Sequence, residues 1–138
     1  NCGNLIRTAE AFGASGIIFH GGVDPYNPKV VRSSAGSFFR MRFAVLEERF
    51  PYKKLFEELK KSDYKSVATT PSGGIAPEDV AENSRIAVIL GNEPRGLPKE
   101  IEALCDDTVT VPIEDTVESL NVATAGAVVL YGIKRSLI

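Results

Sequence analysis

Segments with strand character alternate with segments of helical character along almost the whole sequence, and this alternation limits the folds that the chain can adopt. Segments rich in apolar residues are expected to be strands at 16–20, 40–46, 64–69, 85–90 and 108–111. Apolar residues at helical spacing predict helices at 4–12, 29–34, 51–62, 98–104 and 119–136. Such alternation is typical of an α/β fold with a mainly parallel sheet covered by helices on both faces.

Two of these segments have the most regular patterns. Residues 85–90 (RIAVIL) are almost continuously apolar, as expected of a strand buried on both faces. Residues 51–62 (PYKKLFEELKKS) place Leu55, Phe56 and Leu59 on one helical face and direct Lys and Glu side chains to water. At 138 residues the chain has the size of one domain with one hydrophobic core.

Charge and cysteine content exclude several classes of protein. The 16 Lys and Arg and 18 Asp and Glu give a net charge of −2, so any contact with RNA must be local. Cys2 and Cys105 form no CxxC pair and have only His20 to accompany them, which excludes a four-ligand zinc site. We expect no metal and a reduced, cytoplasmic protein, with a disulfide as the alternative. No apolar run approaches the roughly 18 residues of a membrane span, and no signal-peptide pattern is present.

Loops that follow strands are the expected place for a ligand, because ligands of open α/β sheets lie beyond the carboxyl ends of the strands. Three loops meet this condition, at 70–74, 91–96 and 112–119. The loop GNEPRG at 91–96 is not a Walker A motif, because Leu97 and Pro98 stand where Lys and Ser or Thr are required. No GxGxxG opens a helix after a strand, so a Rossmann dinucleotide site is not expected.

Three short motifs occur in order along the chain. The first is NCGNLIR at 1–7, with the pattern Asn-x-Gly-x-x-x-Arg, and the second is LGNEPRG at 90–96, with the pattern Leu-Gly-x-Glu-x-x-Gly. The third combines VPI at 111–113 with SLNV at 119–122. In order and spacing they resemble the motifs of the SpoU branch of the SPOUT family, also called the TrmH family. Its members are S-adenosylmethionine-dependent RNA ribose 2′-O-methyltransferases.

This resemblance implies an α/β fold with a C-terminal trefoil knot, in which the C-terminal segment threads a loop. It also implies S-adenosyl-L-methionine as cofactor, a tRNA or rRNA as partner, and a homodimer with its active sites at the subunit interface. Residues 1–138 would then be the catalytic domain, and a first strand and, in many members, an RNA-recognition domain are expected before Asn1. The alternative is a catalytically silent module of the same fold that binds RNA or dimerises.

The family pattern also implies which residues hold the cofactor. They lie at the ends of three expected strands, in the loops that follow and at the start of the last expected helix, at Thr69, Thr70, Leu90, Gly91, Asn92, Gly96, Val111, Ile113, Leu120 and Ala123. Small residues in the last helix would support a dimer contact, at Ala123, Ala125, Gly126, Ala127 and Gly132. Ordinary packing in the core is the alternative for this last set, because small residues serve any close helix contact.

The catalytic residues implied by the motifs are Arg7, Asn1, Glu93, Ser119 and Asn121. A ribose hydroxyl is a poor nucleophile, so we interpret Arg7 as a fixed cation that orients the hydroxyl or its neighbouring phosphate and stabilises the developing alkoxide. The proton would pass to that phosphate or to water. Asn1 and Glu93 would brace the same centre by hydrogen bonds.

The short polar residues before the last helix have a second interpretation. Ser119 is expected to be the N-cap of that helix, with Asn121 in its first turn, so capping would account for Ser119 alone. The resemblance directs both side chains toward the ribose and Arg7. Arg32, Lys29, Arg40 and Arg42 are candidates for contact with an RNA phosphate, with ordinary surface charge as the preferred interpretation of the last three.

Overall fold

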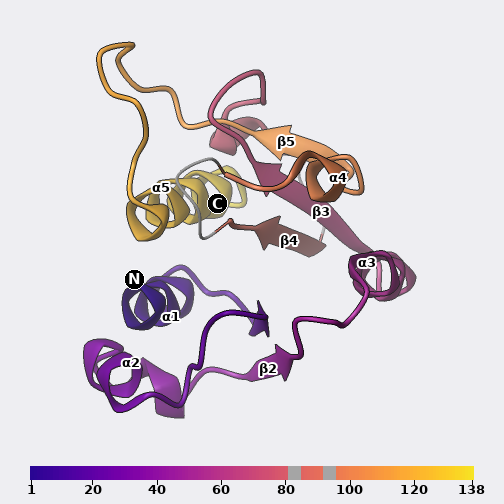
Figure 1. Cartoon of the computed structure of the whole chain (residues 1–138). Helices are drawn as coiled ribbons and strands as arrows, with labels where there is room; N and C mark the ends of the chain where they lie inside the picture. The colour runs from indigo at the N-terminus through magenta and orange to yellow at the C-terminus, as the bar shows by residue number, and fades with distance from the viewer. Residues whose placement is uncertain (81–84, 92–95) are drawn as a thin grey trace. The chain divides into compact units, whose positions relative to one another are not determined.

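The computed structural model describes residues 1–80, 85–91 and 96–138. These residues form two compact units, 1–50 and 51–138, whose elements are labelled in Figure 1. The strands of both units pair in parallel and are flanked by helices. The expected α/β class with parallel strands is therefore confirmed.

The first unit is built around a two-stranded parallel sheet. Its elements are α1 (Cys2–Ala11), β1 (Ile17–His20), α2 (Pro28–Ser33), the short 3-10 helix η1 (Ser37–Phe39) and β2 (Phe43–Leu46). The register of the sheet sets Ile17 opposite Phe43 and His20 opposite Leu46. Helix α1 packs against both α2 and η1.

Helix α1 follows from its sequence. Ile6 and Ala9 are buried at helical spacing, as the apolar pattern predicts. The helix ends where Gly13 takes a positive φ of 80°. There the Gly13 N–H donates to the Glu10 carbonyl at 3.0 Å, and the Ala14 N–H donates to the Ala9 carbonyl at 2.8 Å. This pair of bonds is the usual helix ending at a left-handed glycine, and it ends α1 within one residue of the predicted bound at residue 12.

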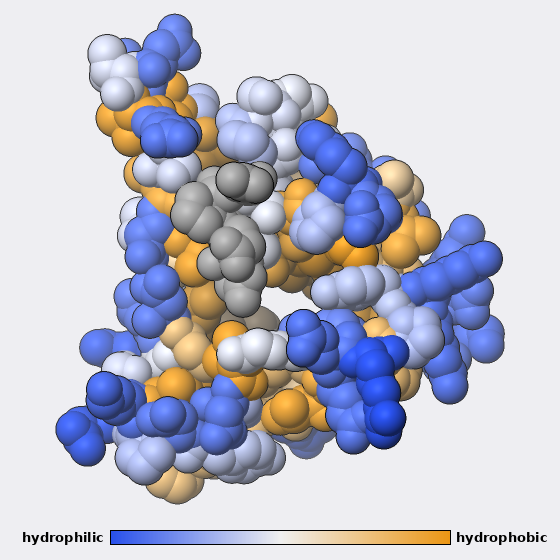
Figure 2. Space-filling view, viewed as in Figure 1, coloured by the Kyte–Doolittle hydropathy of each residue, from blue (hydrophilic) through white to orange (hydrophobic). Residues whose placement is uncertain are grey.

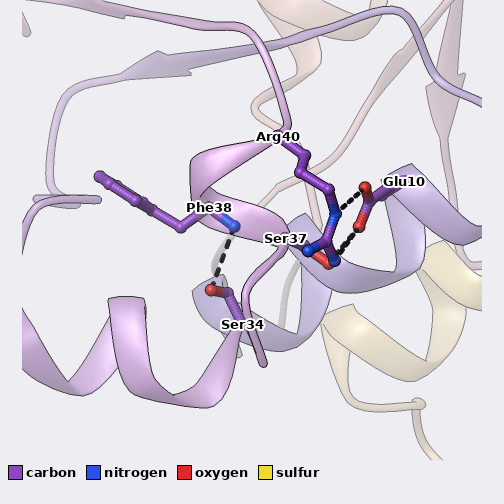
Figure 3. A network of polar contacts seen from close by, with 5 residues as sticks. All are labelled: Glu10, Ser34, Ser37, Phe38 and Arg40. Atoms are coloured by element: carbon purple, nitrogen blue, oxygen red, sulfur yellow. Dashed lines mark hydrogen bonds and ion pairs between the residues drawn. The ribbon is translucent and has the colours of Figure 1, made fainter.

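A carboxylate on α1 fixes η1 (Figure 3). Glu10 accepts hydrogen bonds from Arg40 Nε at 2.5 Å, from Arg40 Nη2 at 2.9 Å and from the hydroxyl of buried Ser37 at 2.5 Å. These contacts, the Arg40 hydrogen bonds first, lower the pKa of Glu10 from 4.5 to about 2. One turn earlier, the buried Ser34 hydroxyl accepts from the Phe38 N–H at 3.2 Å. Residues 34–40 are thus tied to α1 by polar contacts.

The Glu10 carboxylate makes a pH-dependent contribution to stability. Because its folded pKa is depressed, that contribution is complete above pH 4.5 and is lost as the pH falls through about 2. We expect Glu10→Gln to lower the thermal unfolding midpoint at pH 7, and the difference from the unmodified chain to shrink progressively between pH 4.5 and pH 2. Glu57→Gln, on the exposed face of the amphipathic segment 51–62, is the control and should shift the midpoint little. An equal difference at pH 7 and pH 2 would contradict the prediction.

The second unit is built around a three-stranded parallel sheet. Its elements are α3 (Tyr52–Lys61), β3 (Tyr64–Thr69), the 3-10 helix η2 (Pro77–Asp79), β4 (Arg85–Ile89), α4 (Lys99–Glu102), β5 (Asp107–Val109) and α5 (Val122–Ser136). The strand order is β4-β3-β5, which places β3 in the centre. Phe56 is the buried residue of α3, whose other side is lined by hydrophilic side chains, at the right of Figure 2.

The core of the second unit lies between the sheet and α5. It consists of Val67 and Val109 from the sheet, Val129 and Ile133 from α5, and Val80. Successive strand residues point to opposite faces, and the neighbours of Val67 on β3 are buried as well. Both faces of the central strand are therefore covered, as expected of a sheet with helices on both faces.

Helix α5 approaches η2 closely at a glycine. A Cβ added to Gly132 would lie 2.4 Å from the Cβ of Pro77, within the same chain. Packing inside the chain thus accounts for Gly132, one member of the small-residue set in the last helix.

Asp106 joins the start of β5 to β3. Its carboxylate accepts from the Ser66 N–H at 2.8 Å and from the Ser66 hydroxyl at 3.0 Å. The backbone hydrogen bond from Ser66 is the main cause of the lowered pKa of Asp106. Lys65 and Asp107 form an ion pair at 3.1 Å beside this junction. These contacts set the register in which Val67 pairs with Asp107.

Several predicted boundaries are wrong by a few residues. The predicted strand 40–46 begins only at Phe43, because the chain first forms η1 and Arg40 is its C-cap. The predicted strand 108–111 is observed as Asp107–Val109, and the predicted helix 98–104 is the single turn α4, with Pro98 as its N-cap. Among the described residues, no helix has the length and apolar character needed to cross a membrane.

Candidate active site

The carboxyl ends of β3, β4 and β5 lie at one edge of the sheet, because neighbouring strands are parallel. The loop after β3 returns to pair with the end of β5. The Thr70 N–H donates to the Val109 carbonyl at 2.9 Å, the Ile75 N–H to the Thr108 carbonyl at 3.0 Å, and the Thr110 N–H to the Ile75 carbonyl at 2.9 Å. The loop after β3 is thus joined by backbone hydrogen bonds to the end of β5, just before the predicted ligand loop 112–119.

Thr69 and Thr70 end β3 at this edge, and both are half-buried. The Thr69 hydroxyl donates to the Ile89 carbonyl of β4 at 3.1 Å, and the Thr70 hydroxyl donates to the Ser72 carbonyl at 3.2 Å. Each hydroxyl hydrogen is therefore used within the protein. A ligand at this edge would meet the threonine oxygens as acceptors.

The two glycines of the second motif, Gly91 and Gly96, lie close to each other. A Cβ added to Gly91 would lie 2.9 Å from both the carbonyl carbon and the carbonyl oxygen of Gly96. Gly96 has a φ of 78°, and a Cβ there would lie 3.8 Å from Cδ of Pro71, in the loop after β3. Leu90, which follows β4, is half-buried. Gly91 and Gly96 therefore meet beside the loop that follows Thr70, although Asn92 and Glu93 lie outside the described residues.

Residues 110–121 form the long loop from β5 to α5, which is drawn in orange in Figure 1. Val111 packs against the hydrophobic core of the unit, and Leu120 at the other end of the loop is half-buried. Ile113 is 37% exposed. The third motif thus places aliphatic side chains at both ends of a loop that leaves the carboxyl edge of the sheet.

The polar residues before α5 have a different arrangement from the one expected. The helix begins at Val122, and its N-cap is Asn121 rather than Ser119. Asn121 Oδ1 accepts from the Ala123 N–H at 2.9 Å and from the Thr124 N–H at 3.4 Å. The predicted N-cap was wrong because both residue types cap helices well, and the residue directly before the first helical turn makes the bonds. Ser119 is exposed in the loop, so capping explains Asn121 and leaves Ser119 unexplained.

Substitutions of Asn121 can distinguish its capping role from a catalytic role. Asn121→Ala removes the acceptor for two helical N–H groups, so we expect a loss of about 1 kcal/mol in the free energy of unfolding. Asn121→Asp and Asn121→Ser retain an oxygen that can cap, so both should keep most of that stability while removing the carboxamide N–H donors. Chemical unfolding of the three variants measures this difference. Equal destabilisation by all three would contradict the capping role.

The remaining predicted residues lie in the first unit. Asn1 is the N-cap of α1, and Arg7 is exposed on the same helix, one turn after Gly3. Arg32 is exposed in the last turn of α2. Ala123, in the second unit, is buried, and its N–H is used by the cap of α5.

Two residues at the carboxyl edge were not predicted. The Gly74 N–H donates to the Thr110 hydroxyl oxygen at 2.8 Å. A Cβ on Gly74 would lie 2.7 Å from the carbonyl carbon of Val109 and 2.9 Å from that of Thr108. The consecutive glycines 73 and 74 in a loop were the available indication that backbone segments approach closely there.

The thiols are unsuited to nucleophilic chemistry at neutral pH. Cys2 and Cys105 are both free. Burial is the main cause that raises the pKa of Cys105 to about 11, and burial also raises the pKa of Cys2. The thiolate is the reactive form, so little of it is present at neutral pH. We therefore expect no thiolate chemistry from these two cysteines at neutral pH.

Comparison with known proteins agrees with the motifs. The family model described as the SpoU rRNA methylase family matches residues 1–131. The chain is 32% identical to the 23S rRNA (guanosine(2553)-2′-O)-methyltransferase RlmP of Bacillus subtilis, over 97% of this chain and 53% of that protein.

Two similar solved structures are described as bound to AdoMet. The SpoU methyltransferase AviRb from Streptomyces viridochromogenes has a TM-score of 0.86 and 33% identity, over 97% of this chain and 52% of that one. An rRNA methyltransferase from Sinorhizobium meliloti has a TM-score of 0.88 and 29% identity, over 99% of this chain and 52% of that one. The chain thus spans about half the length of each of these relatives.

Proposed function

Because the chain belongs to the SpoU rRNA methylase family, we propose that residues 1–138 form the catalytic part of an S-adenosylmethionine-dependent RNA ribose 2′-O-methyltransferase. The main support is the carboxyl edge of the β4-β3-β5 sheet, where the second and third motifs meet the loop after β3. Relatives with AdoMet bound share this fold over almost the whole chain.

The residues at this edge suit an adenosine-containing cofactor. Val111, Ile113 and Leu120 offer aliphatic surface to a purine ring, and the backbone around Gly91 is bare of a side chain, so a ligand can approach it closely. Backbone groups of the third-motif loop would hydrogen-bond the ring. When bound, S-adenosylmethionine supplies a methyl group on a cationic sulfonium.

The first motif would serve the RNA ribose. Arg7 is exposed on α1, and a guanidinium stays protonated at neutral pH, so it can orient the hydroxyl or its phosphate and stabilise negative charge on oxygen. Ser119 and Asn121 would position the ribose, with Asn1 and Glu93 bracing Arg7 and the loop. Arg32 would contact an RNA phosphate.

We also propose the assembly, knot and location that accompany this function. An exposed apolar face of α5 supports a homodimer, because Val128 is 40% exposed and Tyr131 is 52% exposed. The active site would lie at the interface of the two subunits, and the C-terminal segment would form the trefoil knot. The free thiols of Cys2 and Cys105 support a reducing compartment such as the cytoplasm.

Calorimetric titration with S-adenosylhomocysteine tests the proposal. We expect the unmodified chain to bind, and Leu120→Glu to weaken binding at least tenfold, because it sets a carboxylate at a half-buried apolar position. Val117→Glu is the matched control, since Val117 is 47% exposed in the same loop and should tolerate the charge. Absence of binding by the unmodified chain, or equal losses in both variants, would contradict the proposed cofactor site.

A further inference from the structure

Two aromatic side chains of the first unit are unusually exposed. Phe39, at the end of η1, is 77% exposed, and Tyr26, just before α2, is 62% exposed. Both rings pack edge to face on Phe38, with centroid distances of 5.2 Å for Phe39 and 5.7 Å for Tyr26. Phe38 in turn lies 5.0 Å from Phe43 of β2. We call Tyr26 and Phe39 the aromatic pair.

The aromatic pair stands on a rigid support. The Phe38 N–H is bound by the hydroxyl of Ser34, whose side chain is fully buried, and Ser37 is held by Glu10 (Figure 3). Ala35 has a φ of 51°, an uncommon conformation for a residue with a Cβ, and it turns the chain into η1. Such local strain is characteristic of functional segments. Phe39 is therefore presented to solvent from a fixed turn.

The first unit, which carries the aromatic pair, has a small excess of positive charge, although the Asp24 carboxylate accepts a hydrogen bond from the Tyr26 N–H at 3.0 Å. Residues 1–50 contain six Lys and Arg and four Asp and Glu, whereas residues 51–138 contain ten and fourteen. Lys29 and Arg32 are exposed on α2, whose N-cap Asn27 follows Tyr26 directly. Hydrophilic side chains gather over α2 at the lower left of Figure 2. The unit with exposed rings is thus also the unit with excess positive charge.

We propose that the aromatic pair is a stacking surface for unpaired bases of a single-stranded RNA segment, with phosphates contacted by Lys29 and Arg32. Every base has a face that can stack on an aromatic ring, and basic side chains beside such rings are the usual pattern of single-strand binding. This inference rests on the proposed function and deepens it, because it names an unpaired RNA segment as the substrate feature bound by the first unit. A second copy of the chain is the competing occupant, and the charge excess favours RNA.

A tryptophan introduced into this surface is a specific fluorescent reporter, because the natural sequence contains no tryptophan. In Phe39→Trp the indole replaces an exposed ring, and in the matched control Tyr52→Trp it replaces a ring that is 41% exposed on α3. We expect a single-stranded oligoadenylate of about 12 nucleotides to quench the fluorescence of Phe39→Trp saturably and that of Tyr52→Trp little. A duplex of the same length should quench Phe39→Trp more weakly.

Affinity for the same labelled oligonucleotide, measured by fluorescence anisotropy, supplies the second readout. We expect Phe39→Ala and Phe39→Leu each to weaken binding about fivefold to tenfold, since leucine keeps the apolar surface but cannot stack. Tyr26→Ala should act in the same direction, and Tyr52→Ala should leave the affinity unchanged.

The results that would overturn the inference can be told apart from one another. Equal quenching of the two tryptophan variants, or unchanged affinity in all three variants of the aromatic pair, would overturn the inference. A blue shift of Phe39→Trp emission that depends on protein concentration and not on RNA would assign the surface to a second copy, and would overturn it too. Neither readout uses cofactor or methyl transfer, so a chain that shows the quenching but transfers no methyl group would contradict only the proposed function.

Discussion

Replacing Arg7 by alanine should lower the rate of methyl transfer by about a hundredfold to a thousandfold, the usual loss when one donor to a developing oxyanion is removed. Arg7 is exposed on α1, where Ile6 and Ala9 form the buried side, so its removal should leave the helix folded. Binding of S-adenosylhomocysteine should stay within about twofold, because the proposed cofactor residues lie in the second unit. Single-turnover transfer of a labelled methyl group to unmodified rRNA or tRNA, beside calorimetry of the same variant, measures both quantities.

Two further variants define the role of this side chain. Arg7→Lys keeps the positive charge but loses the planar fork of donors, so we expect it to recover only part of the rate. Arg49→Ala is the control, because Arg49 is an exposed arginine of the same unit whose ion pair with Glu47 is at the surface. A rate unchanged by Arg7→Ala would exclude it from catalysis. An equal loss of cofactor affinity would instead indicate that it stabilises the fold.

The parts of the fold predicted correctly are those determined by local pattern. The strand at Tyr64–Thr69 has the predicted bounds, because strand character is a local property of the sequence. The start of α5 was misplaced, since Ser119 and Asn121 are both good caps and only the backbone path decides between them. The turn η1 was missed because its polar anchor, Glu10, lies 27 residues earlier in the chain than Ser37.

In the candidate site, too, features determined by local sequence were predicted and features determined by contacts between distant residues were not. The second and third motifs coincide with loops at the carboxyl edge, and parallel pairing of β3 with β4 and β5 brings the ends of those strands to one edge. The contact of Gly74 with Thr110 could not be predicted, because residues 36 positions apart meet only when the loop after β3 pairs with β5. A motif marks which residue types are required, and it does not say whether packing or chemistry requires them.

Gly3 illustrates that distinction. It is the glycine of the first motif, and it lies on the buried side of α1. A Cβ at this position would lie 2.6 Å from the backbone carbonyl oxygen of Val30 and even closer to the hydroxyl of Ser33, both in α2. On an exposed helix, Gly→Ala would stabilise by about 1 kcal/mol through helix propensity. Here we expect Gly3→Ala to destabilise by roughly 2 kcal/mol, because α1 and α2 must move apart.

Thermal and urea unfolding of Gly3→Ala measure this loss, which should lower the melting temperature by several degrees. Asn4→Ala is the matched control on the same helix, since Asn4 is exposed and its replacement should be neutral or slightly stabilising. Adding Ser33→Ala to Gly3→Ala should restore only part of the loss, because the carbonyl oxygen of Val30 belongs to the backbone and cannot rotate away. A Gly3→Ala chain as stable as the unmodified one would show that α1 and α2 can separate without cost. The glycine of the first motif would then have a chemical role. It would not be required for the packing of α1, the helix that carries Arg7, against α2.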